Sequence, residues 1–189
     1  METAASEGVA VQKPGGQKMR VMVALDESDG GFYALKWALD NLVNGVSATN
    51  EPSQESGMIT LVHVQHPFQP SIIPVGPGGA AFYTPPTIVE SVRKAQQESA
   101  AALLSRALKM CADKNIKADT LVLEGDAKDM ICQATEQMHI DLLVVGSRGL
   151  GKIKRAFLGS VSDYCAHHAK CPILIVKPPK ESSSSQSKP

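Results

Sequence analysis

The sequence predicts an α/β protein in which a doubly wound parallel sheet carries helices on both faces. Short apolar runs alternate along the chain with longer amphipathic stretches, in the order β-α-β-α-β-α-β-α-β. The short runs are apolar or β-branched throughout, which is typical of strands buried on both faces. The five predicted strands are residues 21–25, 58–64, 120–123, 142–145 and 173–176.

The amphipathic stretches predict four helices, because their apolar residues recur at spacings of three and four. Either Asp26 or Ser28 can cap the first helix, since both side chains accept hydrogen bonds from backbone N–H groups. Asp126 marks the start of the third helix, and Ser160 begins the fourth. The helical patterns cover residues 32–42, 88–111, 125–138 and 160–168.

The composition predicts one globular domain between two disordered tails. The chain has 189 residues, of which 43% are hydrophobic, so it can bury a core without metals or disulfides. Residues 1–18 and 178–189 are rich in Gly, Pro, Ser and charge, and are too polar to offset the entropy of ordering them. The predicted domain therefore spans residues 19–177.

Charge and hydropathy exclude several functional classes. The 19 Lys and Arg residues balance the 19 Asp and Glu residues, so bulk charge points to neither nucleic acid nor a membrane surface. No apolar run has the length of a signal peptide or a membrane span. The four cysteines form no C-x-x-C pair and are predicted to be buried thiols. We expect a protein of the cytoplasm, or of cytoplasm and nucleus.

Two connections between the predicted elements are long. Residues 44–57 form a polar excursion, whereas residues 65–86 mix prolines and glycines with apolar side chains such as Ile72 and Tyr83. Loops of this length are uncommon in a compact domain. The apolar content of the second loop predicts that it packs in part against the domain.

The most informative segment follows the fourth strand. Gly146 ends a buried run, and a helix begins near Ser160. Open α/β sheets bind ligands where a parallel strand ends beside a helix N-terminus, because backbone N–H groups and the positive end of the helix dipole meet there. From Gly146 to Lys180 basic residues dominate and Asp163 is the lone acid. Phosphate is therefore the predicted ligand.

Other interpretations of these glycines compete with this one. Gly146 to Lys152 matches G-x-x-x-x-G-K, but a Walker A loop then needs Ser or Thr to hold magnesium, and the next residue is Ile153. A Rossmann G-x-G-x-x-G that starts at Gly149 fails, because its third glycine position is Lys154. The simplest alternative is a glycine-rich surface turn with a solvated basic face.

The spacing Gly146-x2-Gly149-x9-Gly159-Ser160 resembles the nucleotide-binding signature of the universal stress protein family, in its ATP-binding branch. The similarity extends over residues 19–177, and the His-His and Cys-Pro pairs near the end look like plant members of the family. The further matching segments are Val23-Ala-Leu-Asp26-Glu-Ser28, Leu61-Val-His63-Val64, Gly125-Asp126-Ala127, Ser160-Val-Ser162 and Ala166-His167-His168-Ala-Lys-Cys171-Pro172.

The resemblance implies a Rossmann-like fold of the adenine nucleotide alpha hydrolase type, with five strands in the order 3-2-1-4-5. It also implies a homodimer joined along the fifth strand, from Ile173 to Val176, and ATP or AMP, with or without Mg²⁺, at the ends of strands 1 and 4. In that order, connections leave strands 1 and 4 in opposite directions, which independently creates a crevice between Asp26 and Gly146.

By similarity, the glycines and Ser160 hold ribose and phosphates, Val161 and Ser162 add N–H groups, and Val64 offers its backbone to adenine. Arg148 either pairs with phosphate or is merely solvated. Asp26 either accepts from the nucleotide or caps the first helix. The full set of predicted binding residues is Ala24, Leu25, Asp26, Val64, Gly146, Ser147, Arg148, Gly149, Gly159, Ser160, Val161 and Ser162.

The implied function is a regulatory module of the stress response whose loops and dimer respond to bound nucleotide. Two alternatives remain open: a slow magnesium-dependent ATPase, and a nucleotide-independent holdase that works through residues 65–86. No nucleophile signature is present, so no catalytic residue is assigned. Cys165, His167, His168 and Cys171 match no common zinc spacing, so no metal is assigned.

Overall fold

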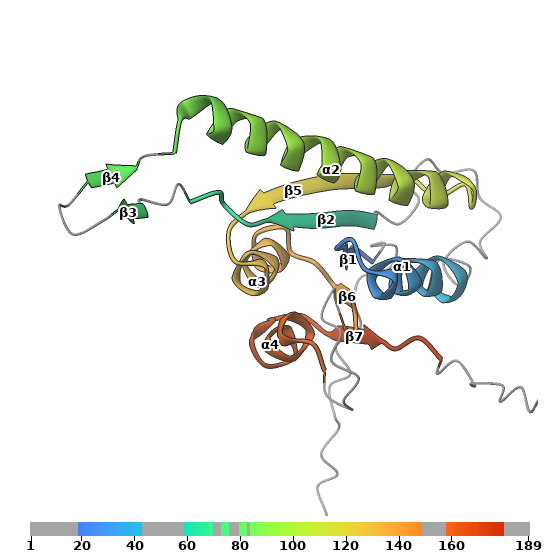
Figure 1. Cartoon of the computed structure of the whole chain (residues 1–189). Coiled ribbons are helices and arrows are strands. Elements are labelled where there is room, and N and C mark those ends of the chain that lie inside the picture. The colour runs from blue at the N-terminus through green and yellow to red at the C-terminus, as the bar shows by residue number, and fades with distance from the viewer. Residues whose placement is uncertain are drawn as a thin grey trace, which may run out of the picture.

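Five parallel strands form the central sheet of the computed structural model, which describes residues 19–42, 59–69, 73–75, 80–82, 84–148 and 158–179 (Figure 1). The elements in chain order are β1 (Val21–Ala24), α1 (Asp29–Asn41), β2 (Ile59–Gln65), β3 (Ile73–Val75), β4 (Ala80–Phe82), α2 (Pro86–Ala112), β5 (Ala118–Glu124), α3 (Ala127–Gln137), β6 (Leu142–Gly146), α4 (Ser160–His168) and β7 (Ile173–Val176).

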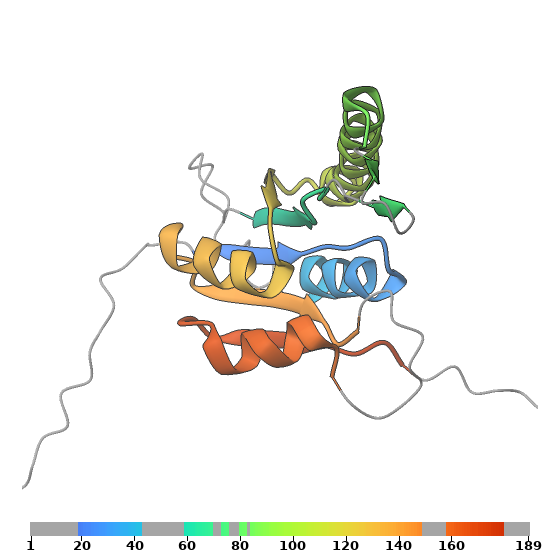
Figure 2. The same ribbon diagram turned by 60° about the vertical axis from the view of Figure 1, so that its left-hand side comes forward.

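The strand order of the central sheet is β5-β2-β1-β6-β7, and every pairing in it is parallel. The stacked strands can be followed from β2 through β1 and β6 to β7 in Figure 2. With the small β3-β4 hairpin left out of the count, this order is 3-2-1-4-5, so the predicted fold class and order are confirmed. In β1, Val23 lies opposite Leu61 of β2 and Val144 of β6, which makes β1 and β6 the switch point.

Two apolar cores cover the two faces of the sheet. Side chains alternate between the faces along each strand, so Val21 and Val23 contact the α1 and α2 side whereas Met22 contacts the α3 and α4 side. In Figure 1, α3 and α4 lie together on one side of the sheet and α1 lies on the other. Arg106 of α2 stacks over the Phe32 ring of α1 at 3.9 Å, which ties the two helices on the first face together.

One predicted strand is less buried than its apolar sequence indicates. The run 120–123 is part of β5, which lies at the edge of the sheet, and Val122 is 46% exposed. The prediction that this strand is buried on both faces was therefore wrong, because the face that carries Val122 is only partly covered at this edge of the sheet. Its apolar residues Leu121 and Leu123 pack toward α3, on the inner face.

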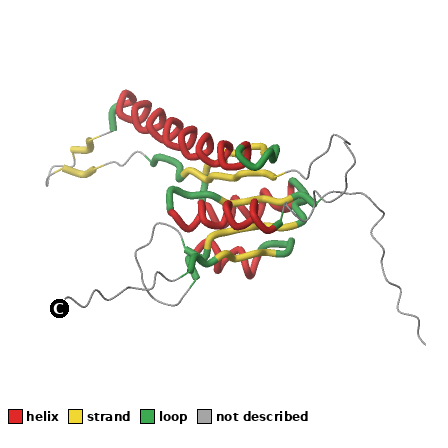
Figure 3. The backbone as a smooth tube through the Cα atoms, turned by 90° about the vertical axis from the view of Figure 1, so that its right-hand side faces the viewer, coloured by secondary structure: helices red, strands yellow, loops and turns green. Residues whose placement is uncertain are grey.

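The structure adds a hairpin within the loop 65–86. Ile73–Val75 pairs antiparallel with Ala80–Phe82, and the hairpin lies beyond the end of the sheet beside the start of α2 (Figure 3). The 27-residue helix α2 is exposed along its first half, and its buried residues begin at Ala100. The predictions for the tails, for residues 44–57 and for the side chains of Ile72 and Tyr83 fall outside the described residues, apart from 178–179 of the second tail. Within the described ranges, every helix is too short or too polar to cross a bilayer.

Candidate functional site

The segment after β1 forms one side of the site. The Leu25 N–H donates to the Val62 carbonyl oxygen at 2.9 Å, which fixes the chain as it leaves the strand. One carboxylate oxygen of Asp26 accepts from the N–H of Ser28 at 3.1 Å and also from the Ser28 hydroxyl. The Ser28 Oγ in turn accepts from the Gly31 N–H at 3.3 Å. Of the two predicted candidates, Ser28 is thus the N-cap of α1, and Asp26 orients that cap.

The end of β6 forms the opposite side and is held by Ser147, which is 5% exposed. The Ser147 N–H donates to the Val176 carbonyl oxygen at 2.8 Å. The Ser147 carbonyl oxygen accepts from the Gly159 N–H at 2.8 Å and from the Ser162 hydroxyl at 3.3 Å. A single residue after β6 therefore bonds both to β7 and to the start of α4.

The first turn of α1 packs directly on the end of β6, and glycines make this approach feasible. A Cβ atom on Gly30 would lie 2.5 Å from the Arg148 carbonyl oxygen, and one on Gly146 would lie 2.9 Å from the Gly30 carbonyl. Gly146 was predicted to let the backbone approach an anion. The structure shows that its missing side chain also admits the backbone of α1, which brings the ends of β1 and β6 together.

The start of α4 lies beside Ser147. Gly159 is its N-cap, in extended conformation, and Ser160 is its first residue, as the sequence predicted. The buried Ser162 hydroxyl donates to the Gly159 carbonyl oxygen at 2.9 Å. Among the described residues no side chain caps this helix, while the exposed Asp163 carboxylate in the first turn offsets part of its dipole. Ser160 is exposed, as a phosphate contact requires.

An apolar edge completes the site next to β2. Ala24 ends β1 opposite Val62, so Val64 lies two residues further toward the same edge. The His63 ring donates from Nδ1 to the Leu25 carbonyl oxygen at 2.9 Å, because a carbonyl oxygen can only accept. His63 is thus the packed histidine that its strand position indicates, and its bond orients the peptide that leaves β1.

The predicted residues of β1, β2, β6 and α4 gather at the carboxyl edge of the sheet. Ser147 and Ser162 are the most deeply buried polar members, whereas Asp26, Val64 and Arg148 are half-buried. The remaining predicted residue, Gly149, lies outside the described residues. Sequence reasoning missed Gly30, although two glycines in the first turn of a helix cost about 1 kcal/mol each relative to alanine and so signal a packing constraint.

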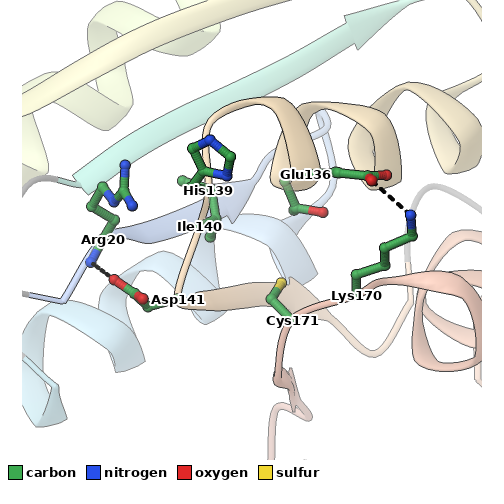
Figure 4. Close-up of a pocket in the computed structure, with 8 residues that line it drawn as sticks. Arg20, Glu136, His139, Ile140, Asp141, Lys170 and Cys171 are labelled. Atoms are coloured by element: carbon green, nitrogen blue, oxygen red, sulfur yellow. Dashed lines mark hydrogen bonds and ion pairs between the residues drawn. The ribbon is translucent and has the colours of Figure 1, made fainter. Parts of the chain in front are cut away.

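A cavity of about 330 Å³ opens at the opposite, amino-terminal edge of the sheet (Figure 4). The Arg20 N–H donates to the Asp141 carboxylate at 2.8 Å, and the Lys170 ammonium lies 2.6 Å from Glu136. The carboxylates of Asp141 and Glu136 and the Lys170 ammonium are thus engaged with protein groups, and Cys171 lies among them. None of the predicted nucleotide residues that the structure describes lines this cavity.

The cysteine and histidine segment at the end of α4 is occupied by local contacts. Each histidine ring bonds one turn back through Nδ1, His167 to the Asp163 carbonyl oxygen and His168 to that of Tyr164, both at 2.8 Å. The His168 ring also stacks on the Tyr164 ring, with centroids 3.9 Å apart. No group of three or more ligand side chains in the described part of the chain has the arrangement of a metal site.

The fold and the site define a class of protein: a doubly wound parallel α/β domain with its candidate ligand site at the switch point between β1 and β6. The sequence model of the universal stress protein family matches residues 19–177, and the chain belongs to that family.

Relatives of known sequence and structure agree with this assignment. A universal stress protein A-like protein of Arabidopsis thaliana is 29% identical over 172 residues, which cover 86% of this chain and 92% of the relative. The crystal structure of an Arabidopsis universal stress protein family protein with AMP bound matches with a TM-score of 0.59 at 25% identity, over 89% of this chain and 97% of that one. A universal stress protein in complex with cAMP has the same fold at 20% identity, with a TM-score of 0.56 over 86% and 98% of the two chains.

Proposed function

We propose that this protein binds an adenine nucleotide, AMP or ATP with or without Mg²⁺, and acts as a regulatory module of the stress response. One observation carries the proposal: the segments after β1 and β6 and the start of α4 meet at one edge, joined through Ser147 and Gly30. Nucleotides bind at such switch points because helix N-termini and backbone N–H groups converge there. The AMP-bound relative supports the choice of adenine nucleotide.

The phosphates are assigned to the start of α4. Gly159 leaves the helix entrance without a side chain, and the exposed Ser160 can add its hydroxyl to the backbone N–H groups of Ser160 and Val161. Gly149 and Arg148 would approach from the same loop. The Ser162 hydroxyl is not assigned to the phosphates, because its single proton is already shared between the Gly159 carbonyl oxygen at 2.9 Å and the Ser147 carbonyl oxygen at 3.3 Å.

The nucleoside is assigned to the other side of the site. Ala24 and Val64 offer backbone groups and apolar surface to the adenine ring, which suits the mostly apolar lining of nucleoside pockets. The buried Leu25 lies beneath them, and its N–H and carbonyl oxygen already bond to Val62 and His63. Asp26 keeps one carboxylate oxygen on Ser28, so its second oxygen is the acceptor offered to a ribose hydroxyl.

The direct test is the identity of the nucleotide carried by the full-length protein. Mass spectrometry of the small molecules released on denaturation should detect AMP or ATP in stoichiometric amount. Isothermal titration of the stripped protein should then show binding of the same nucleotide. Protein that releases no nucleotide and gives no heat with AMP, ATP or cAMP would refute the proposal.

We also propose a homodimer joined along β7, which is an edge strand of the sheet. The carbonyl oxygens of Pro172 and Val176 accept from β6, so by alternation the backbone of Ile175 faces the free edge. Unpaired strand edges of this kind invite pairing with a second chain. Val176 is 6% exposed and belongs to the core, so a charge placed there would disrupt the fold as well as an interface.

The substitution Ile175→Pro tests the dimer, because proline removes the outward-facing N–H. Two symmetry-related hydrogen bonds of about 1 kcal/mol each are lost, so the dimer should weaken about tenfold or more. Analytical ultracentrifugation measures the effect, and circular dichroism confirms folding. Val122→Pro is the matched control at the other edge, since Gly125 donates inward to Gln65 and Val122 therefore faces outward. A folded Ile175→Pro variant that dimerises like the parent would place the interface elsewhere.

The proposed nucleotide-binding domain spans residues 19–177, with residues 1–18 and 178–189 as tails. Its four cysteines are free thiols, as expected for a protein of a reducing compartment. We accordingly place the protein in the cytoplasm, or in both cytoplasm and nucleus, which fractionation of cells that express it would test.

A further inference from the structure

Two cysteines far apart in the sequence lie side by side where α3 packs against α4. Cys132 lies in the middle of α3 and Cys165 lies in α4, and both helices pack on the same face of the sheet. Their sulfur atoms are 3.7 Å apart, with the Cys132 thiol directed at the Cys165 sulfur. A disulfide bond is about 2.05 Å long, so bonding needs only a small approach of the two helices.

We propose that Cys132 and Cys165 are a modification site, at which a peroxide converts the two thiols into a reversible intrachain disulfide that shifts α4. The effect on ligand binding rests on the proposed nucleotide function, because the start of α4 is the assigned phosphate site. The disulfide itself does not depend on that function.

The reaction balances with the peroxide as the oxidant and needs no further reactant. The Cys132 sulfur, as thiolate, attacks one peroxide oxygen, the O–O bond breaks, and hydroxide leaves as water after it takes up a proton. Cys132 is then a sulfenic acid. The Cys165 sulfur attacks the Cys132 sulfur, the S–S bond forms, the S–O bond breaks, and a second water leaves with the Cys165 proton. Two thiols are oxidised by two electrons and one peroxide is reduced to two waters.

The environment fixes the order and the pace of these steps. Cys132 is half-buried whereas Cys165 is fully buried, so Cys132 is the sulfur that meets the oxidant. Burial raises the pKa of the Cys132 thiol and raises that of Cys165 to about 12. Both groups are therefore thiols at neutral pH, and the pair should oxidise slowly there and faster as the pH rises. Such a pair responds to sustained rather than brief oxidation.

The position of Cys165 links the disulfide to the candidate site. Cys165 follows Ser162 by one turn of α4, and the Ser162 hydroxyl holds α4 to the Ser147 carbonyl oxygen at 3.3 Å. The Cys165 sulfur also rests 4.0 Å from the Lys128 carbonyl oxygen of α3. Drawing Cys165 toward α3 pulls on the Ser162 contact, and so displaces the N–H groups assigned to phosphate.

Peptide mapping of the full-length protein tests the modification. The protein is treated with hydrogen peroxide, its remaining thiols are alkylated, and it is digested without reductant for mass spectrometry. We expect a peptide pair linked through Cys132 and Cys165 that dithiothreitol separates, and that forms faster at higher pH. Cys132→Ser should abolish it. Cys111→Ser is the matched control, since Cys111 is buried on the other face of the sheet. A link from Cys132 to Cys171, or oxidation to sulfonic acids with no link, would overturn the proposed pair.

Titration with AMP and ATP tests the consequence for binding. Oxidised protein should bind the nucleotide about fivefold or more weakly than reduced protein, within the usual range of coupling between sites. The affinity of Cys132→Ser should not change on oxidation. Equal affinity of the reduced protein and the fully linked protein would overturn the coupling. Absence of binding in both states would refute the proposed function and the coupling together, whereas the peptide map alone decides whether the disulfide forms.

Discussion

Helices α1 and α4 both begin at the carboxyl edge of the sheet, but their first turns are completed in different ways. At α1 the Ser28 hydroxyl accepts from the Gly31 N–H, and Asp26 holds that hydroxyl in place. At α4 the cap is Gly159, which has no side chain, and the nearby Ser162 hydroxyl turns inward to carbonyl oxygens. A side-chain cap satisfies N–H groups that a ligand would otherwise bind. Under the proposed function, the start of α1 is therefore mainly structural and the phosphates bind at the start of α4.

The starts of the two helices are also linked, because both lie against Arg148. Gly30 in the first turn of α1 touches the backbone of Arg148, and Gly159 lies against the same residue from the α4 side. The segment after β6 is thus enclosed between the two helix starts. A shift of α1 would therefore act on Arg148, which also lies against Gly159 at the start of α4.

The largest effect is expected for Gly30→Ala. Its Cβ would lie 2.5 Å from the Arg148 carbonyl oxygen. Relief of this clash requires the backbone of α1 or the backbone after β6 to move. Overpacking of this kind costs about 1–3 kcal/mol, and the better helix propensity of alanine returns less than about 1 kcal/mol. We expect a net loss of about 2 kcal/mol in the free energy of unfolding, measured by urea denaturation.

Gly31→Ala is the matched control for that variant. Its Cβ would lie 3.1 Å from an Asp26 carboxylate oxygen and 3.3 Å from the Asp26 backbone nitrogen, so its neighbours need to move less than the Arg148 carbonyl oxygen at 2.5 Å from a Cβ on Gly30. Its effect should be smaller than that of Gly30→Ala. Equal stability of Gly30→Ala and the parent protein would contradict the close packing of α1 on β6.

The next effect tests the ligand assignment by giving α4 the kind of cap that α1 has. Gly159→Asp places a carboxylate at the N-cap, where aspartate is among the preferred residues. The carboxylate should compete with phosphate for the same N–H groups and repel it. We expect nucleotide affinity to fall about tenfold or more, which corresponds to about 1.4 kcal/mol. Isothermal titration measures this loss.

Gly159→Ala separates the charge from the added atom. In either variant the Cβ would lie 3.3 Å from the Arg148 Cα, and the extended conformation of residue 159 suits any residue. Alanine should therefore lose much less affinity than aspartate, while the thermal stability of the aspartate variant stays at or above that of the alanine variant. Parallel losses in both variants would place the phosphates away from α4.

Most of the fold could be predicted from the sequence because the signals for its helices and strands are local. Each apolar run and each cap, such as Asp126 at α3, is read from residues a few positions apart, and the strand order followed from the family resemblance. The exposure of Val122 was missed although the predicted order places its strand at the edge, because an apolar run does not record how far a helix covers each face. The β3-β4 hairpin was missed because its short strands lie in a segment dominated by proline and glycine.

The candidate site likewise has a part that could be predicted from the sequence and a part that could not. The glycine spacing after β6 is contiguous in sequence and identifies one side of the site. The role of Gly30 emerges only when β6 lies against α1, more than a hundred positions later in the chain, and the Cys132–Cys165 pair exists only because α3 and α4 are neighbours. Contacts between distant segments depend on packing, and a single sequence records packing only through its apolar periodicity.

The smallest effect is expected when α1 loses its cap. Ser28→Ala removes the hydroxyl that accepts from Gly31 and donates to Asp26, so the free energy of unfolding should fall by about 1 kcal/mol. Nucleotide affinity should stay within about twofold of the parent value, because under the proposed assignment the phosphates lie at α4 and the backbone N–H of residue 28 still holds the Asp26 carboxylate offered to ribose. Asp126→Ala, which removes the cap of α3, is the matched control and should cost similar stability. Urea denaturation and isothermal titration on the same samples separate the two quantities. A tenfold loss of affinity in Ser28→Ala, with affinity unchanged in Asp126→Ala, would mean that the start of α1 binds the ligand directly, and the division of labour between the two helices would be reversed.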